Sequence, residues 1–222
     1  MRTKIKLLFF SFFLLHPCTH LFGNESIASF TGIQKISLDL SAVDVSVKPH
    51  EKSEVDLAIV LSQRLQDEGL KIEHTQSGST LEIRVKIKAK SLSFNDDEAK
   101  ISLWVQHHLT FHVESVSGDA QFSGISAEGI VIESSSGDVS FENVTGPIDV
   151  HTHSGDVKIK NSSGLKKLHS SSGDVSVQDS KGDITAESSS GDQDFQNIDS
   201  RLSVESSSGD IKIIAQKGGI KV

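Results

Sequence analysis

Residues 134–139 read Ser-Ser-Ser-Gly-Asp-Val, and the triplet Ser-Gly-Asp recurs through the second half of the chain. After one 19-residue step its glycines stand 18 residues apart, at Gly118, Gly137, Gly155, Gly173, Gly191 and Gly209. A second series bisects this interval at Gly146, Gly164, Gly182 and Gly218. A fixed period of this kind is typical of a solenoid, in which each repeat is one coil stacked on its neighbours.

Aligning the repeats by steps of 18 residues reveals four apolar columns, two for each of two short strands per coil. The first strand gives Ile130, Ile148, Lys166, Ile184, Leu202 and Ile220, then Ile132, Val150, Leu168, Ala186, Val204 and Val222. The second strand gives Val139, Val157, Val175, Gln193 and Ile211, then Phe141, Ile159, Val177, Phe195 and Ile213. Because alternate residues of a strand share a face, these columns predict a narrow core inside the stack.

Two polar residues, Lys166 and Gln193, interrupt these columns. At Lys166 we expect a β-bulge that lets Leu165 take the inward position. We expect turns at the glycines, with the glycine of each Ser-Gly-Asp at positive φ. Another turn column, predicted to adopt left-handed backbone and to hydrogen-bond along the stack, contains Asn143, Asn161, Asp179 and Asn197.

Residues 33–113 alternate apolar and polar side chains without the 18-residue period, which predicts irregular strands. The polar segment 91–100 shows no alternation and is predicted to be a loop. We therefore divide the chain into a leader (1–23), an irregular β part that caps the solenoid (24–113) and the β-helix repeats (114–222).

The leader is typical of a secretory signal peptide. Arg2, Lys4 and Lys6 precede an apolar run over residues 7–15, which is shorter than the roughly 20 residues of a membrane-spanning helix. Cleavage after Gly23 predicts an exported protein that is periplasmic, on the outer surface or secreted. A lipid anchor on Cys18 is the alternative, although Pro17 stands where a small residue is normally required.

The net charge is −8, and the repeats carry it: residues 114–222 hold 17 acidic and 9 basic residues, whereas residues 1–113 hold 13 of each. Such a surface repels nucleic-acid phosphate and anionic lipid, and attracts cations or basic partners. We therefore expect no nucleic-acid partner and consider an envelope protein or a glycan instead.

Residues 113–119, Val-Glu-Ser-Val-Ser-Gly-Asp, together with the repeats that follow, resemble bacterial β-strand-repeat domains of unknown function that are described as adhesins. The resemblance covers roughly residues 33–222. It implies an all-β fold, a single-stranded right-handed β-helix, and a location in the bacterial envelope. It supplies no catalytic or ligand residues to carry over.

The aspartates of the repeat form the first candidate site. Like charges one rung apart destabilise a sheet unless something compensates them. Compensation can come from N–H groups of the turns, or from a divalent cation such as Ca²⁺. Calcium-binding β-rolls place the aspartate two residues after a glycine, whereas here it follows the glycine directly. The column contains Asp138, Asp156, Asp174, Asp192 and Asp210.

A second candidate column precedes the serines and alternates with inward residues, so it should face solvent. Two adjacent histidines beside glutamates could hold Zn²⁺ or a similar metal. The alternative is a solvated face in which neutral histidine relieves repulsion between glutamates. The candidate ligands are Glu133, His151, His169 and Glu187, and Glu205 continues the column.

The sequence contains no Gly-x-Ser-x-Gly motif and no phosphate loop, and no cofactor is expected. We therefore predict a non-enzymatic, adhesin-like binding surface or scaffold. A carbohydrate-active β-helix enzyme is the alternative, which requires an acidic pair and a basic residue to converge in a groove. Self-association is a third hypothesis, because the repeat stops part-way through a coil at Val222 and leaves a sheet edge to pair.

Overall fold

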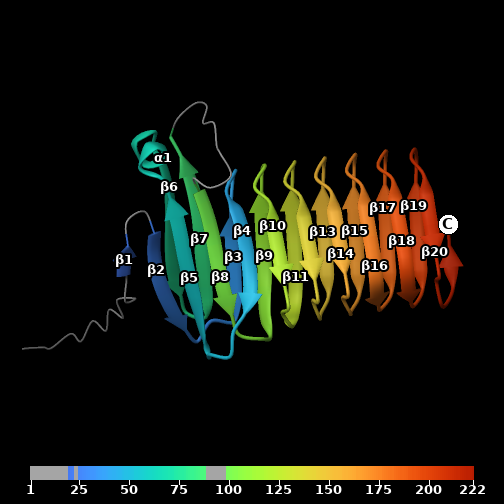
Figure 1. Cartoon of the computed structure of the whole chain (residues 1–222), viewed down its shortest axis with the longest axis horizontal. Coiled ribbons are helices and arrows are strands. Elements are labelled where there is room, and N and C mark those ends of the chain that lie inside the picture. The colour runs from blue at the N-terminus through green and yellow to red at the C-terminus, as the bar shows by residue number, and fades with distance from the viewer. Residues whose placement is uncertain (1–19, 23–24, 89–98) are drawn as a thin grey trace, which may run out of the picture.

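The computed structural model describes residues 20–22, 25–88 and 99–222, which form a long stack of β-strands (Figure 1). Most of the predicted signal peptide, including Cys18, lies outside the described residues, as does most of the predicted loop over residues 91–100. Its last two residues, Ala99 and Lys100, begin a strand instead. Within the described residues, no helix is long and apolar enough to cross a membrane.

Each coil contributes one strand to each of two parallel sheets. One sheet continues through β10 (Ala120–Ser123), β12 (Val139–Glu142), β14 (Val157–Lys160), β16 (Val175–Lys181), β18 (Gln193–Asp199) and β20 (Ile211–Ile214). The other continues through β9 (Leu109–Ser115), β11 (Ala127–Ser134), β13 (Ile148–Thr152), β15 (Lys166–Ser170), β17 (Ile184–Ser188), β19 (Leu202–Ser206) and β21 (Ile220–Lys221). Equivalent residues such as Val139 and Val157 pair directly, which confirms the predicted β-helix with 18-residue coils.

The stack continues beyond the first Ser-Gly-Asp into strands from the N-terminal part. β3 (Lys35–Asp39) and β4 (Asp44–Pro49) form the rung next to β9 and β10. β7 (Thr80–Ile87) and β8 (Ala99–Val105) form the following rung, parallel to β3 and β4. The rung of β3 and β4 therefore lies between the rung of β7 and β8 and the rung of β9 and β10, although β7 and β8 come between them in the sequence. This reversal of order explains why the segment lacks the 18-residue period.

Antiparallel strands cover the N-terminal end of the stack. β5 (Glu54–Leu61) pairs with β8, and β6 (Leu70–Ser77) pairs with β7. The short helix α1 (Gln63–Asp67) connects them, and the side chain of Ser62 caps its N-terminus. β2 (Glu25–Thr31) and β1 (His20–Phe22) extend one sheet beyond β5. These strands cover the apolar core at this end, as terminal repeats of a solenoid must.

The four predicted columns form the core of the coils. From Ile130 to Val204 their side chains are at most 2% exposed, whereas Ile220 and Val222 in the last coil are 52% and 73% exposed. The structure adds a fifth inward column, which lies at or just after the ends of the strands of one sheet, outside their regular alternation. It contains Ile125, Val144, Ser162, Ser180 and Ile198.

The bulge that we expected at Lys166 is wrong. The side chain of Lys166 is fully buried, whereas Leu165 is 46% exposed. Lys166 also pairs with its partners on β13 and β17 without any shift of register. A register shift occurs instead between Ala127 and Gly129 on β11.

Lys166 fits inside because the residues of the fifth column next to it are small and polar. Ser162 and Ser180 stand there in place of the larger apolar residues of other coils. The Lys166 ammonium donates to the carbonyl oxygens of Ser162, Gly164 and Lys181, at 3.4, 3.0 and 2.9 Å. Burial lowers the pKa of this amine from 10.5 to about 8.

The predicted positive φ in the Ser-Gly-Asp turns is also wrong, because only Gly209 of these six glycines has it. Glycine is required for steric reasons instead. A Cβ on Gly155 would lie 2.0 Å from the carbonyl oxygen of Gly137 in the preceding rung, and the contact recurs along the stack. Positive φ occurs in the second glycine series and, as predicted, in the column of Asn143, Asn161, Asp179 and Asn197.

Candidate functional site

The Asp column is a hydrogen-bonded ladder along the outside of the turns. In successive rungs, Oδ1 of one aspartate accepts the backbone N–H of the next aspartate at 2.8–3.0 Å. The ladder begins before the repeat does, because Asp44 accepts the N–H of Asp119. The predicted members of this ladder are Asp138, Asp156, Asp174, Asp192 and Asp210.

The ladder explains how the stack accommodates a column of like charges. A hydrogen bond from a backbone N–H to a carboxylate is charge-assisted and contributes about 1.5–3 kcal/mol, which offsets repulsion between neighbours. Lys158 adds a cation 3.4 Å from Asp156 and 3.9 Å from Asp138. The contacts therefore assign the column a structural role, with N–H donors from the next rung. Binding of a ligand to the column stays a prediction.

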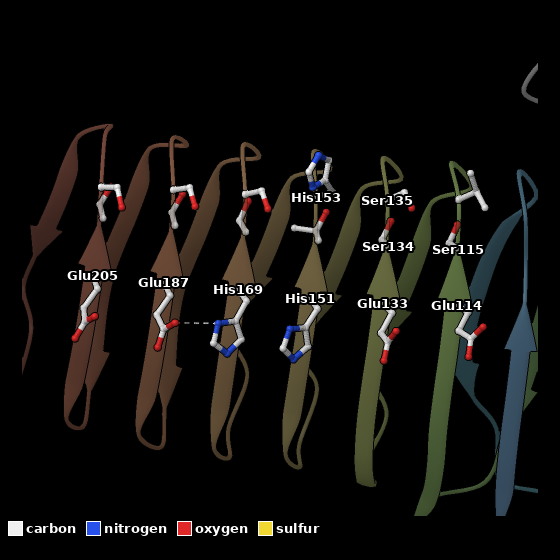
Figure 2. A pocket seen from close by; sticks show the side chains of 18 of the residues that line it. Glu114, Ser115, Glu133, Ser134, Ser135, His151, His153, His169, Glu187 and Glu205 are labelled. Carbon is white, nitrogen blue, oxygen red and sulfur yellow. Dashed lines mark ion pairs between the residues drawn. The ribbon is translucent and has the colours of Figure 1, made fainter.

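The second column lies along the sheet that contains β9 and faces solvent (Figure 2). Asp39 of β3 extends it by one rung at the N-terminal end. Figure 2 shows its side chains pointing the same way from successive strands, with the imidazoles of His151 and His169 between the glutamates. The following residues, paired rung to rung, are called the Glu/His column: Glu114, Glu133, His151, His169, Glu187 and Glu205.

This column forms one wall of an open groove of about 870 Å³, called the Glu/His groove. A row of largely buried hydroxyl side chains forms its floor: Ser115, Ser134, Thr152, Ser170, Ser188 and the less buried Ser206. The other wall consists of Val116, Ser135, His153, Ser171, Ser189 and Ser207. The residues that line the groove include no lysine and no arginine, so its potential is negative.

The floor hydroxyls hold the turns together. Ser134 Oγ donates to the carbonyl oxygen of Gly137 at 2.9 Å, and Ser170 Oγ donates to that of Gly173 at 2.7 Å. Ser115, Thr152 and Ser188 make the equivalent bond in their own coils. The first serine of the Ser-Ser-Ser runs at 134–136, 170–172 and 188–190 is therefore structural, and the opposite wall presents the more exposed hydroxyls.

His151 and His169 stack face to face in the middle of the groove, with ring centroids 4.6 Å apart and an interplanar angle of 11°. Nδ1 of His169 lies 3.2 Å from Oε2 of Glu187. Nε2 of His151 lies 3.2 Å from Oδ1 of Asp149, a residue outside the predicted column. This Asp149 oxygen is shielded from solvent and has no hydrogen-bond partner.

The predicted metal ligands Glu133, His151, His169 and Glu187 thus share a column without converging on one point. Among the described residues, no group of three or more His, Cys, Asp or Glu side chains is already arranged to hold a metal ion. Metal binding here stays a prediction, and it requires at least one side chain to move.

Carboxylates are direct neighbours at both ends of the Glu/His column. Glu114 pairs with Glu133, and Glu187 pairs with Glu205. Side chains outside the column contact them: His112 Nε2 lies 3.1 Å from Glu114, and Lys221 Nζ lies 3.5 Å from Glu205. Adjacent carboxylates in a groove favour a ligand that carries hydrogen-bond donors or positive charge.

Comparison with protein families gives a match that covers the chain from β3 to its last described strand. The family model described as Toastrack DUF4097 matches residues 33–222. No curated protein sequence matches the chain.

Several solved structures are similar over most of their length. A putative lipid binding protein from Parabacteroides distasonis is 14% identical, with a TM-score of 0.48, over 89% of this chain and 97% of that one. A putative adhesin from Bacteroides fragilis is 13% identical, with a TM-score of 0.46, over 89% and 96%. A putative adhesin from Parabacteroides distasonis is 14% identical, with a TM-score of 0.41, over 90% and 98%.

Proposed function

The chain belongs to the Toastrack DUF4097 family, and from this premise we propose that it is a non-enzymatic binding module of the cell envelope or the extracellular space. Its binding surface is the Glu/His groove. The observation that carries the proposal is the groove of about 870 Å³, which presents a row of hydroxyl side chains beside a column of glutamates and histidines along successive rungs. Rungs repeat about every 4.8 Å, so a linear ligand with a regular repeat can make equivalent contacts along the groove.

The chemistry of the lining favours a glycan. Carboxylates accept hydrogen bonds from sugar hydroxyls, and serine hydroxyls such as those of Ser135 and Ser189 both donate and accept. An anionic chain would be repelled, because neither lysine nor arginine lines the groove. A neutral or amino-substituted glycan is therefore the expected ligand.

The lining also favours binding over hydrolysis. A carbohydrate-active enzyme would need an acidic pair and a basic residue to converge, and histidines are the only basic side chains that line the groove. The floor hydroxyls bond to glycine carbonyls, as Ser134 does to Gly137. Incubation with an oligosaccharide should leave its chain length unchanged, which chromatography of the products checks.

Titration calorimetry with three oligosaccharide probes tests the function. The probes are cationic chitosan oligomers, neutral cello-oligomers and anionic galacturonate oligomers. We expect the cationic probe to bind most tightly and the anionic probe least tightly. Replacing Glu133 and Glu187 together by glutamine should weaken binding, whereas Glu142→Gln, an exposed change on β12 outside the groove, should not. A folded wild-type chain that binds none of the probes, or a Glu142→Gln variant that binds as weakly as the groove variant, contradicts the proposal.

The last described coil favours self-association as a second role. Ile214, Ile220 and Val222 are 45%, 52% and 73% exposed on β20, β21 and the residue that follows. Exposed apolar edge strands are templates for pairing with another chain. Light scattering should show that the average mass of the wild-type protein increases with protein concentration. The increase should be smaller for the Ile220→Lys variant. A mass that stays monomeric at all concentrations rules this role out.

A further inference from the structure

We propose that Asp149, His151 and His169 form a binding site for a divalent transition metal ion such as Zn²⁺ or Cu²⁺. The three residues lie on the solvent side of β13 and β15, at the edge of the Glu/His groove. Imidazole nitrogens and carboxylate oxygens are common ligands of these ions. The site does not depend on which ligand the groove binds.

Two atoms of the site already have the spacing of metal ligands. Nε2 of His151 and Oδ1 of Asp149 are 3.2 Å apart. Two ligands at about 2.0–2.1 Å from one tetrahedral Zn²⁺ lie about 3.3–3.4 Å from each other. These two atoms are therefore already spaced almost as two ligands of one ion are.

The Asp149 carboxylate has one oxygen that lacks a hydrogen bond. Its Oδ1 is shielded from solvent and has no hydrogen-bond partner, although it lies at contact distance from the His151 ring. A polar oxygen that is shielded from water without a partner costs free energy. An ion bound between this oxygen and His151 would satisfy it.

His169 supplies the third ligand. Its ring stacks on that of His151 at 4.6 Å, and its Nδ1 lies 3.2 Å from Glu187. A proton on Nδ1, held by the Glu187 carboxylate, leaves the lone pair of Nε2 available for a metal. A rotation of this partly exposed ring toward His151 completes a site with three protein ligands and water in the fourth position.

The charged groups around the site favour a cation. Glu133 and Glu187 flank the two histidines in the column, and Lys167 pairs with Asp149 across the rung. With neutral imidazoles, the three carboxylates outweigh the one ammonium.

Calorimetric titration of Zn²⁺ into the full chain tests the site without any glycan present. We expect His151→Gln and Asp149→Asn each to weaken binding by about tenfold or more. His153→Gln is the matched control, because His153 is an exposed histidine of the opposite wall. It should leave the affinity unchanged, and thermal melting verifies that all three variants fold.

Electron paramagnetic resonance of the Cu²⁺-loaded chain tests the third ligand. Coupling to two imidazole nitrogens is expected in the wild type and coupling to one in His169→Gln. A wild-type chain that gives no heat above dilution, or a His151→Gln variant that binds Zn²⁺ as tightly as the wild type, overturns the site. A Cu²⁺ spectrum that His169→Gln does not alter overturns the role of His169.

Discussion

The carboxylate of Asp138 accepts the backbone N–H of Asp156 at 2.9 Å, one rung away along the stack. The same bond links aspartates from Asp44 to Asp210. A motif that recurs in every coil thus joins each coil to the next. The proposed binding surface is the Glu/His groove, where the side chains vary from glutamate to histidine between rungs.

Removing one step of the Asp ladder should destabilise the solenoid. Asp156→Ala deletes the acceptor for the N–H of Asp174 and should lower the free energy of unfolding by about 1–2 kcal/mol. Asp156→Asn keeps a weaker acceptor and should cost less. Chemical denaturation followed by circular dichroism measures both, with Glu142→Ala on the exposed face of β12 as a control. An Asp156→Ala chain as stable as the control contradicts the role of the ladder.

Gly155 should be intolerant of any side chain, although its backbone is not left-handed. In Gly155→Ala the new Cβ would lie 2.0 Å from the carbonyl oxygen of Gly137, so the rungs must separate, at a cost of about 3 kcal/mol or more. Gly129→Ala is the matched control, because nothing lies within 4 Å of a Cβ there. Thermal melting should separate the two variants clearly. Equal losses in both would refute the steric explanation.

Replacing the buried lysine should stabilise the protein. Lys166→Ile restores the residue type of the neighbouring coils and removes a charge from the core, so we expect a gain of about 1–3 kcal/mol at neutral pH. The carbonyls of Ser162 and Lys181 also accept backbone N–H groups, so they keep partners without the ammonium. Lys167→Ile, an exposed change on the same strand, should give no such gain.

The same lysine predicts a dependence of stability on pH. Its folded-state pKa of about 8 lies below the ordinary 10.5, so the unfolded chain holds this proton more tightly. The contribution of Lys166 to the free energy of unfolding should therefore rise from about pH 8 to about pH 10.5, by about 3 kcal/mol in all. Unfolding curves across this range should show the stability gap between Lys166→Ile and the wild type narrowing as pH rises. A constant gap would contradict the lowered pKa.

Gln193 offers a second opportunity for stabilisation. Its Nε2 donates to the carbonyl oxygen of Glu205 at 3.0 Å, but its buried Oε1 has no partner. Gln193→Val matches Val175 in the preceding coil and should raise the free energy of unfolding by about 1 kcal/mol. Gln121→Val, at an exposed position of β10, should change it by less than about 0.5 kcal/mol. Urea denaturation compares the two, and a loss of stability in Gln193→Val would be the contrary result.

The coils and their core could be predicted because the period is strict and each residue of a column pairs with the residue of the same column in the next rung. The order of the N-terminal rungs could not, because β3 pairs with β7 and β9, which are distant in the chain. The burial of Lys166 depends on Ser162 and Ser180, which lie in a column outside the strand alternation. The recurrence of glycine in the Ser-Gly-Asp turns predicted that these positions require glycine. The cause could not be predicted, because it is the carbonyl oxygen of another coil, which leaves no room for a Cβ.

The candidate site also contains residues that the sequence predicted and one that it did not. Alternation placed Glu133, His151, His169 and Glu187 on one face, and the structure keeps them in one column. Asp149 was not predicted because it stands two residues before His151, in a column whose residue type changes at every rung. Its shielded, unpaired oxygen is visible only when side chains are placed in three dimensions.

Nuclear magnetic resonance of the imidazole groups during titration with chitosan oligomers tests the central claim most directly. His151 and His169 line the Glu/His groove, whereas His74 lies on β6 in the N-terminal cap and packs against Phe30. If the groove is the binding surface, the signals of His151 and His169 shift together and saturate while those of His74 stay in place. Saturable binding that leaves the His151 and His169 signals unchanged would contradict this account.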